Sequence, residues 1–264
     1  QLYAEDNQEA YDNMVMAFNI AENKDVMLPI MICQDGFITS HAVMNMEILD
    51  DMTVKEFVGE REPVDYLLNP EEKFAVGPYA VSDYYMESRK AQAHAMENAK
   101  QVILDVAKDF EKISGRKYGL IEEYKMDDAE YAMVIIGSAA GTAKEAVDEM
   151  REAGKKVGII KIRSFRPFPG EEIATSLKKC KAVAVMDRCE SFSTNGGPVG
   201  AETMQAMYTN GCTAKAINIM YGIGGRDVTV GDMRGVYDTL EEIAKTGETG
   251  PTYRYMGLRD KEAK

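Results

Sequence analysis

Residues 131–162 read YAMVIIGSAAGTAKEAVDEMREAGKKVGIIKI, which is an apolar run, a turn with glycine, an amphipathic stretch and a second apolar run. Unbroken apolar runs are typical of strands that are buried on both faces of a parallel sheet. The stretch between them carries apolar residues three and four positions apart, which predicts a helix. Because parallel strands need a crossover of this kind, the stretch predicts a β–α–β unit and decides the fold class.

The same alternation extends along the following sequence. Strands are predicted at 131–136, 156–162, 182–186 and 214–220, and helices at 142–153, 171–179, 199–208 and 231–244. Repeated βα units predict an α/β domain with helices on both faces of a parallel sheet. We place the domain boundary within residues 115–129 and assign residues 121–264 to this domain.

Residues 1–120 are predicted to form a different domain. Apolar residues at helical spacing predict a first helix that ends near Glu22 and has Asp6 or Asn7 as its N-cap. The apolar run 26–33 predicts a strand that is buried on both faces of a parallel sheet.

A long connecting helix is predicted from residue 86 to 113. Apolar residues again alternate three and four apart there, and Gly115 is a suitable helix stop. Residues 50–78 contain three prolines, and they predict an irregular excursion over the surface with a short helix at 53–58.

The composition excludes several classes of partner. The chain has 264 residues, a formal net charge of −13 and an isoelectric point near 4.8. Such an acidic surface repels phosphate backbones and acidic membranes, so we expect no nucleic acid and no membrane as partners. No apolar stretch approaches the ~20 residues of a membrane-spanning helix.

The cysteines predict a reducing, cytoplasmic location and no metal site. They form no CxxC pair, and only two histidines could add ligands. An iron–sulfur cluster needs about four thiolates that converge, so we predict buried, reduced thiols instead. The four residues are Cys33, Cys180, Cys189 and Cys212.

Residues 34–41 read QDGFITSH and directly follow the apolar run 26–33. Ligands collect at the carboxyl ends of parallel strands, and this loop offers a carboxylate, a glycine, a hydroxyl and an imidazole. An Asp-Gly turn followed by a serine helix cap explains the same residues, so both interpretations stay open. The candidate substrate- or cofactor-proximal residues are Asp35, Gly36, Ser40 and His41.

Two further segments offer groups that bind anions. Residues 137–142 (GSAAGT) begin a predicted helix, whose backbone amides could hold a phosphate. They match neither GxGxxG nor a GK[ST] phosphate loop, so a tight turn capped by Thr142 is favoured. Arg163 and Arg166 could grip a carboxylate or phosphate of the substrate or of a neighbouring subunit. A structural corner, in which these arginines pair with the chain's own acids, is favoured.

Glycine-rich loops follow two later strands. One contains Asp187-Arg188 and the glycines of 196–200, and the other is residues 221–227 (YGIGGRD). Such glycines indicate positive φ angles or close approach of another group, and an interface is favoured over a ligand. The candidate interface residues are Gly224, Gly225, Arg226 and Asp227.

In their order, these motifs resemble the 2-oxoacid:ferredoxin oxidoreductases. Each motif is weak alone, but the ordered set is specific and covers nearly the whole chain. The sequences of these motifs are similar to those of the alpha subunit of the multi-subunit pyruvate enzymes. The motifs are QEAYD (8–12), LP (28–29), DGF (35–37) and SH (40–41) for the first domain, and IGS (136–138), VGIIKIR (157–163), RPFP (166–169), DR (187–188) and GIGGRD (222–227) for the second.

The resemblance implies an incomplete thiamine-diphosphate-binding-type domain followed by a parallel-sheet, transketolase-C-terminal-like domain. It implies a subunit, inactive alone, of an enzyme that converts pyruvate, coenzyme A and oxidised ferredoxin to acetyl-CoA, carbon dioxide and reduced ferredoxin, or the reverse. Thiamine diphosphate with Mg would be shared with a partner subunit, and 4Fe-4S clusters would lie in partner subunits. The implied partners are beta, gamma and ferredoxin-like delta subunits, and ferredoxin.

One departure from the family concerns catalysis. The family's thiamine-activating glutamate, and its substrate-gripping threonine and arginine, lie near the start of the alpha subunit and have no match here. Because the sequence begins Gln1-Leu2-Tyr3 without a methionine, we expect that it lacks its natural N-terminus. No catalytic residue is therefore assigned, and Asp35 and His41 are the near-site candidates.

Other functions stay open. The substrate could be 2-oxoglutarate or a branched-chain oxoacid, since substrate choice rests partly on residues outside this sequence. The chain could instead be a non-catalytic interaction subunit, or part of a transketolase-type enzyme without iron. Iron content and thiamine diphosphate binding of the native complex would separate these classes.

Overall fold

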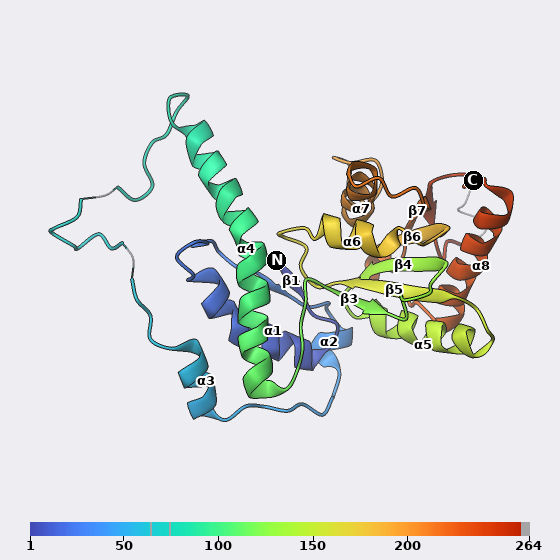
Figure 1. Cartoon of the computed structure of the whole chain (residues 1–264), viewed down its shortest axis with the longest axis horizontal. Helices are drawn as coiled ribbons and strands as arrows, with labels where there is room; N and C mark the ends of the chain where they lie inside the picture. Colours follow the sequence, from blue (N-terminus) through green and yellow to red (C-terminus); the bar gives the residue numbers. More distant parts are fainter. Residues whose placement is uncertain (64, 74, 260–264) are drawn as a thin grey trace.

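The computed structural model describes residues 1–63, 65–73 and 75–259, which form two parts (Figure 1). The first part contains β1 (Leu2–Tyr3), α1 (Asn7–Ala21), β2 (Ile32–Cys33), α2 (Ile38–His41), α3 (Asp51–Val58) and α4 (Tyr85–Ser114). The second contains β3 (Ile121–Tyr124), β4 (Tyr131–Ile136), α5 (Ala139–Glu152), β5 (Val157–Ile162), α6 (Gly170–Leu177), β6 (Ala182–Asp187), α7 (Pro198–Thr209), β7 (Lys215–Met220), η1 (Ile223–Gly225), α8 (Val230–Thr246) and β8 (Tyr253–Tyr255). The predicted α/β class is confirmed.

The second part is built on a six-stranded sheet with the order β3-β5-β4-β6-β7-β8. All neighbours pair in parallel except β3, which is antiparallel to β5. The four predicted βα units are confirmed, with bounds that differ by up to three residues. The edge strands β3 and β8 were not predicted, because β3 (IEEY) carries two acidic residues and β8 has only three residues.

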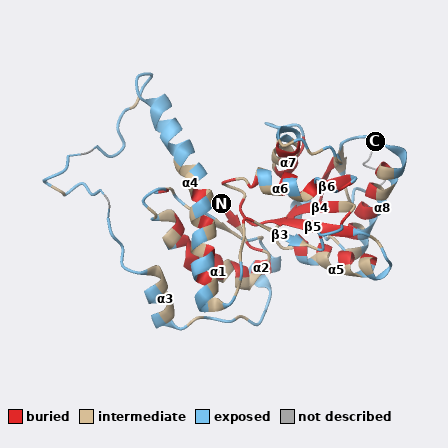
Figure 2. Cartoon of the chain, viewed as in Figure 1, coloured by how far each residue is buried: buried red, intermediate tan, exposed pale blue. Residues whose placement is uncertain are grey.

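Helices cover both faces of this sheet, as predicted. On β4, Met133 and Ile135 face α5 and α8, whereas Ala132 and Val134 face α6 and α7. These four side chains are fully buried, and Figure 2 shows the central strands in the colour of buried residues. The apolar run of β4 is therefore continuous because each of its faces meets a helix layer.

The first part is built on α1 and α4. Met16 and Ile20 of α1 pack against Ile103 and Phe110 in the second half of α4. Both predicted helices are confirmed; Asp6 caps α1 through a hydrogen bond from the Glu9 N–H, and α4 ends at Gly115 in the left-handed conformation.

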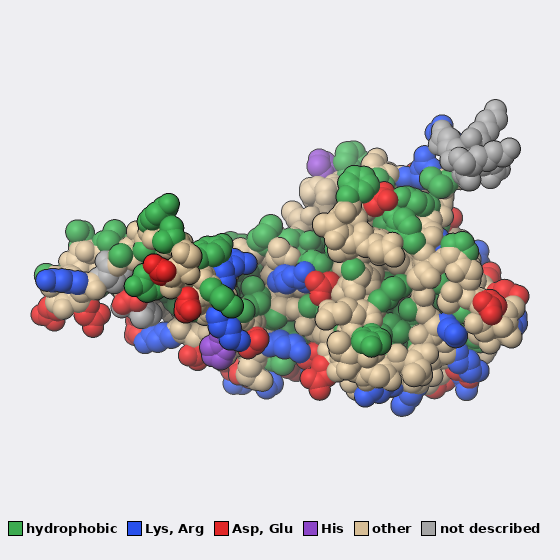
Figure 3. Space-filling view, turned by 90° about the horizontal axis from the view of Figure 1, so that it is seen from above, with side chains coloured by type: hydrophobic (Ala, Val, Ile, Leu, Met, Phe, Trp, Pro, Cys, Tyr) green, Lys and Arg blue, Asp and Glu red, His purple; other side chains and the backbone are tan. Residues whose placement is uncertain are grey.

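The first half of α4 and the segment before it project from the body. Tyr85 and Met86 are 58% and 79% exposed, and every residue from 82 to 94 is exposed. Figure 3 shows hydrophobic side chains on the projecting part. As predicted, the described residues between α3 and α4 form neither helix nor strand.

The prediction of a doubly buried strand at 26–33 is wrong. Only Ile32–Cys33 forms a strand, and it is partly exposed. Its partner in the described residues is the two-residue β1, so no sheet extends on both sides. Pro29 has no N–H for a ladder hydrogen bond, and Met31 is 57% exposed. An apolar run reports hydrophobicity, but its burial depends on elements elsewhere in the chain.

Two smaller expectations are also wrong. Helix α5 begins three residues before the proposed cap Thr142, with Ser138 at the N-cap. Of the four cysteines, which are all free, only Cys180 is buried, and Cys189 is exposed. None of the helices in the described ranges is both long and apolar enough to cross a membrane.

Strand β1 joins the two parts. The Leu2 N–H donates to the Met31 carbonyl, and the Tyr3 N–H donates to the Arg163 carbonyl at 2.8 Å. The Phe165 N–H in turn donates to the Gln1 carbonyl at 2.9 Å. The first residues of the chain therefore lie between β2 and the segment that follows β5.

A buried ionic cluster also links the parts. The Lys161 ammonium on β5 lies 2.9 Å from Glu5, 3.0 Å from Glu9 and 2.7 Å from Glu122, and its side chain is 7% exposed. Burial lowers the pKa of Lys161, but Glu9, Glu5 and Glu122 more than offset this, and the pKa is raised. Lys161 is therefore a buried cation with carboxylates from both parts.

Candidate functional site

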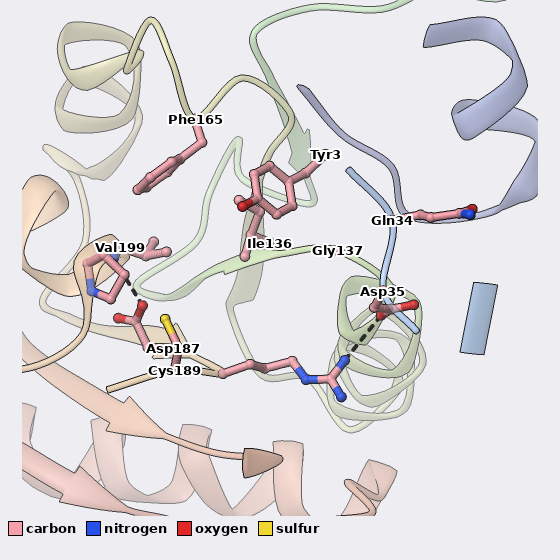
Figure 4. Close-up of a pocket in the computed structure, with 11 residues that line it drawn as sticks. Tyr3, Gln34, Asp35, Ile136, Gly137, Phe165, Asp187, Cys189 and Val199 are labelled. Atoms are coloured by element: carbon pink, nitrogen blue, oxygen red, sulfur yellow. Dashed lines mark hydrogen bonds and ion pairs between the residues drawn. The ribbon is translucent and has the colours of Figure 1, made fainter. Parts of the chain in front are cut away.

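The topology of the sheet places a crevice between β4 and β6. These strands are neighbours, but β4 is followed by α5 on one face of the sheet, whereas β6 is followed by α7 on the other. Loops that leave in opposite directions open a crevice at the carboxyl ends of the strands, where open α/β sheets bind ligands. A cavity of about 240 Å³ lies there (Figure 4). Its lining residues are Tyr3, Gln34, Asp35, Ile136, Gly137, Phe165, Asp187, Arg188, Cys189, Pro198 and Val199.

Asp35 reaches this crevice from the loop after β2. Its Oδ2 accepts hydrogen bonds from the Ser138 N–H at 3.3 Å, from the Ser138 hydroxyl and from Arg188 Nη1 at 3.1 Å. Its Oδ1 accepts from the N–H and hydroxyl of Thr39 at 3.2 and 3.1 Å. The carboxylate therefore lies at the N-terminus of α5, where the helix dipole favours negative charge.

Asp187, the last residue of β6, occupies the N-terminus of α7 in the same way. Its Oδ1 accepts from the Val199 N–H at 3.0 Å, and its Oδ2 accepts from the Gly200 N–H and Asn218 Nδ2 at 2.8 Å each. Burial raises the pKa of Asp187, while these hydrogen bonds oppose the shift. Gly197 is required here, because a Cβ on it would lie 2.2 Å from Asp187 Cγ.

The remaining wall of the cavity is mostly apolar. The rings of Tyr3 and Phe165 lie edge to face with centroids 6.2 Å apart, and Ile136 and Val199 complete the surface. The Cys189 thiol also lines the cavity, and burial, followed by the charge of Asp187, raises its pKa. The thiol is therefore neutral at physiological pH.

The structure separates the candidates of the 34–41 loop. Only Asp35 lines the cavity. Ser40 Oγ accepts a hydrogen bond from the Phe37 N–H at 2.8 Å and lies 2.8 Å from His41 Nδ1. The His41 ring stacks on Phe37, which is 78% exposed. Gly36, Ser40 and His41 are thus exposed around the short helix α2 and outside the crevice.

The two arginines are not among the residues that line the cavity, and they pair within the chain. Arg163 is 2% exposed; its Nε and Nη2 donate to Asn13 Oδ1 at 2.9 and 2.5 Å, over the Tyr118 ring. Arg166 Nη2 donates to Glu202 at 2.6 Å. These contacts support the structural-corner interpretation.

The candidate interface residues lie on η1 and just after it. Gly224, Gly225, Arg226 and Asp227 are all exposed, and Arg226 bonds to the Gly257 carbonyl. Their role as an interface stays a prediction.

The crevice between β4 and β6 does not fit a magnesium diphosphate. The N-termini of α5 and α7, which would be the anion sites of this crevice, are occupied by the carboxylates of Asp35 and Asp187. Within the described part of the chain, no three or more His, Cys, Asp or Glu side chains group closely enough to hold a metal ion.

Two family models match consecutive parts of the chain. Residues 1–108 match the thiamine-diphosphate-binding domain of pyruvate flavodoxin/ferredoxin oxidoreductases, and residues 129–233 match the pyruvate:ferredoxin oxidoreductase core domain II. The chain belongs to this oxidoreductase family. The order of the two matches is the order of motifs on which the sequence resemblance rested.

Relatives in the family extend the similarity to almost the whole chain. Pyruvate synthase subunit PorA of Thermotoga maritima is 43% identical over 98% of this chain and 65% of its own length. The alpha subunit of the NADH-dependent phenylglyoxylate dehydrogenase of Aromatoleum evansii is 41% identical over 96% of this chain and 62% of its own length. The chain thus spans slightly less than two thirds of these oxidoreductase subunits.

A solved structure supports the fold. The 2-oxoglutarate:ferredoxin oxidoreductase from Magnetococcus marinus matches with a TM-score of 0.51 and 18% identity, over 85% of this chain and 39% of that one. At this identity the match shows a shared fold.

Proposed function

We propose that the chain is a subunit of a pyruvate:ferredoxin oxidoreductase (pyruvate synthase). The enzyme would convert pyruvate, coenzyme A and oxidised ferredoxin to acetyl-CoA, carbon dioxide and reduced ferredoxin, or the reverse. The observation that carries this proposal is 43% identity to a pyruvate synthase subunit over 98% of the chain. The subunit is inactive alone, works in the cytoplasm and assembles with beta, gamma and ferredoxin-like delta subunits.

The proposal divides the cofactors among the subunits. Thiamine diphosphate with Mg is shared with a partner subunit and lies outside the crevice between β4 and β6, which does not fit a diphosphate. Partner subunits hold the 4Fe-4S clusters. This chain contributes the face around α2 to the shared site. Support comes from Phe37, Ile38 and Val43, which are 78%, 57% and 101% exposed, because adjacent exposed apolar side chains mark an interaction surface.

The division into domains 1–120 and 121–264 is part of the proposal. It is supported by the family matches, of which one ends at residue 108 and the other begins at residue 129. The first domain would provide the cofactor-facing surface, and the second would provide assembly surface, including the exposed loop at 224–227.

A second candidate is the same chemistry on another 2-oxoacid. The 41% identity to the phenylglyoxylate enzyme's alpha subunit is close to that of the pyruvate relatives, so the identity alone leaves the oxoacid open. Pyruvate is favoured because pyruvate synthase subunits from several organisms are among the relatives and include matches at 43% and 42% identity.

The test is an anaerobic assay of the native complex that contains this chain. Viologen reduction is followed with pyruvate, 2-oxoglutarate, a branched-chain oxoacid or phenylglyoxylate, each with and without coenzyme A. Reduction that needs pyruvate and coenzyme A is the expected result. If another oxoacid supports reduction and pyruvate does not, that oxoacid is the substrate. If the complex contains neither iron nor thiamine diphosphate, the chain is a non-catalytic interaction subunit.

A further inference from the structure

The polar end of the β4–β6 cavity has a surplus of hydrogen-bond donors. Two acidic side chains there are Asp35 and Asp187, and both are already hydrogen-bonded: Asp35 accepts from Thr39, Ser138 and Arg188, while Asp187 accepts from two helix N–H groups and from Asn218. Most of the acceptor capacity of these carboxylates is therefore used within the chain.

Arg188 supplies the free donors. A guanidinium carries five N–H groups, and among the described residues Arg188 makes one hydrogen bond, from Nη1 to Asp35. Its side chain is 31% exposed, and it is one of the residues that line the cavity. The guanidinium can therefore donate hydrogen bonds to a second oxyanion beside Asp35.

A second unpaired group lies close by. The Tyr221 hydroxyl is buried and has no hydrogen-bond partner among the described residues, and Tyr221 is 1% exposed. The Tyr221 N–H donates to the Asp187 carbonyl at 2.9 Å, so this residue lies next to the end of β6, although it is not among the residues that line the cavity. A buried hydroxyl without a partner is uncommon.

The rest of the cavity determines the shape of the ligand. Tyr3, Ile136, Phe165 and Val199 form an apolar wall opposite the polar end. Since this wall comes from both parts of the chain, the cavity lies at a contact between domains, where small-molecule sites are common.

We propose that this cavity binds a small monocarboxylate with a short apolar body, whose carboxylate is held by Arg188 and whose body lies against Tyr3, Phe165 and Val199. A guanidinium binds a carboxylate through paired hydrogen bonds, which favours a monoanion over a neutral amide. A phosphate group is excluded, because Asp35 and Asp187 occupy both helix N-termini. The proposal does not depend on which oxoacid the enzyme uses.

Cys189 provides a local readout, because its thiol lines the cavity and is exposed. The native complex is treated with iodoacetamide at mildly alkaline pH, and the alkylation rate at Cys189 is followed by peptide mass spectrometry. The probe is isobutyrate, and isobutyramide is its uncharged match in shape. Cys212, which does not line this cavity, is the internal control. Isobutyrate should slow alkylation at Cys189 several-fold without a change at Cys212, and isobutyramide should be about tenfold weaker.

Two variants test the two ends of the site. Arg188→Gln should weaken protection by isobutyrate about tenfold, because it removes the charged donor. Since this change also removes the pair with Asp35, Ile136→Phe is the second variant: it keeps that pair but fills the cavity, and it should abolish protection, whereas Ile136→Leu should keep it.

Three results would overturn the proposal: no protection by isobutyrate in the wild-type complex, equal protection by isobutyramide, or undiminished protection in both Arg188→Gln and Ile136→Phe. Pyruvate-dependent viologen reduction is measured on the same preparations. A complex that reduces viologen but shows no protection would remove the cavity proposal and leave the proposed function in place.

Discussion

Asp35 Oδ2 lies 3.1 Å from Arg188 Nη1, although 153 residues separate the two along the chain. The pair joins the loop after β2 to the loop after β6, beside the N-terminus of α5. Asp35 was singled out as a residue near a cofactor, and the structure makes it a contact between the two parts of the chain.

Replacement of Asp35 by asparagine should therefore destabilise the chain. The amide would direct its N–H donors either toward Thr39 or toward Ser138 and Arg188, so at least one donor would lose its acceptor. We expect a loss of about 1–3 kcal/mol in the free energy of unfolding, measured by urea denaturation. Asp238→Asn, at an exposed position on α8, is the control and should change it by less than about 0.5 kcal/mol. Equal effects would contradict the bridging role.

Lys161→Met should have a larger effect. It leaves Glu5, Glu9 and Glu122 close together without their shared cation, and breaking a buried pair in this way costs about 3–5 kcal/mol. Lys181→Met removes an ion pair of which the lysine is 57% exposed, so it should cost less than about 1 kcal/mol. Urea midpoints of both variants, compared with wild type, test the difference.

The same cluster gives a pH dependence at acid pH. Burial raises the pKa of Glu122, but Lys161 and Lys144 more than offset this, so its pKa lies below the ordinary 4.5. Its ion pairs therefore contribute fully above pH 4.5, and the contribution is lost as the pH falls through the lower folded-state pKa. For Lys161, whose pKa is raised above 10.5, the contribution is full below pH 10.5 and is lost as the pH rises. The gap in urea midpoint between wild type and Glu122→Gln should narrow below pH 4.5. A gap that does not change with pH would contradict the assignment.

Two helical glycines should respond in opposite directions to alanine. In α7, a Cβ on Gly200 would lie 2.4 Å from Asn218 Cγ, and Asn218 is fixed by bonds to Asp187 and the Val185 carbonyl. Gly200→Ala should therefore cost about 1–3 kcal/mol. In α8, a Cβ on Gly235 would meet nothing within 4 Å, so Gly235→Ala should add up to about 1 kcal/mol. Thermal denaturation of the two variants distinguishes a crowded position from an open one.

His41→Ala tests the cofactor-facing role of the α2 surface. We expect slower turnover in an intact complex, because His41 and Phe37 form an exposed stacked pair on that face. The matched control is His94→Ala on α4, which removes a histidine that is 68% exposed and lies 3.6 Å from Glu97. Turnover of the assembled complex is compared with its subunit composition by native mass spectrometry. Unchanged kinetics in both His41→Ala and Asp35→Ala would remove these residues from the site.

The sequence predicted the second part of the chain well, because its determinants are local. Strand β4 meets a helix layer on each face, so its apolar run is continuous and can be recognised in the sequence. The run 26–33 has the same composition, but its burial depends on which elements lie beside it, and this information is not contained in the run. The long helix was predictable for another reason: apolar residues recur three and four positions apart over many turns before Gly115.

The cavity could not be assembled from sequence patterns. Tyr3 and Phe165 meet only because β1 pairs with the segment after β5, and no periodicity records such a contact. One signal was available: the glycines after Asp187 indicated close approach, and the group that approaches Gly197 and Gly200 proves to be the side chains of Asp187 and Asn218. Arg163 and Arg166 show the limit of residue type as evidence, since both are used within the chain.

The projecting half of α4 bears on how this chain can be produced. Its residues 85–94 are all exposed, so its first turns should open far more often than the packed half that ends at Gly115. Proteases cut such turns, and exposed tyrosines and methionines nearby favour self-association. Synthesis of the chain by itself should therefore yield clipped or aggregated protein. If the proposed partner subunits cover this helix, synthesis beside them should yield intact protein. The time at which this chain first meets its proposed partner subunits would therefore affect the yield of the complex.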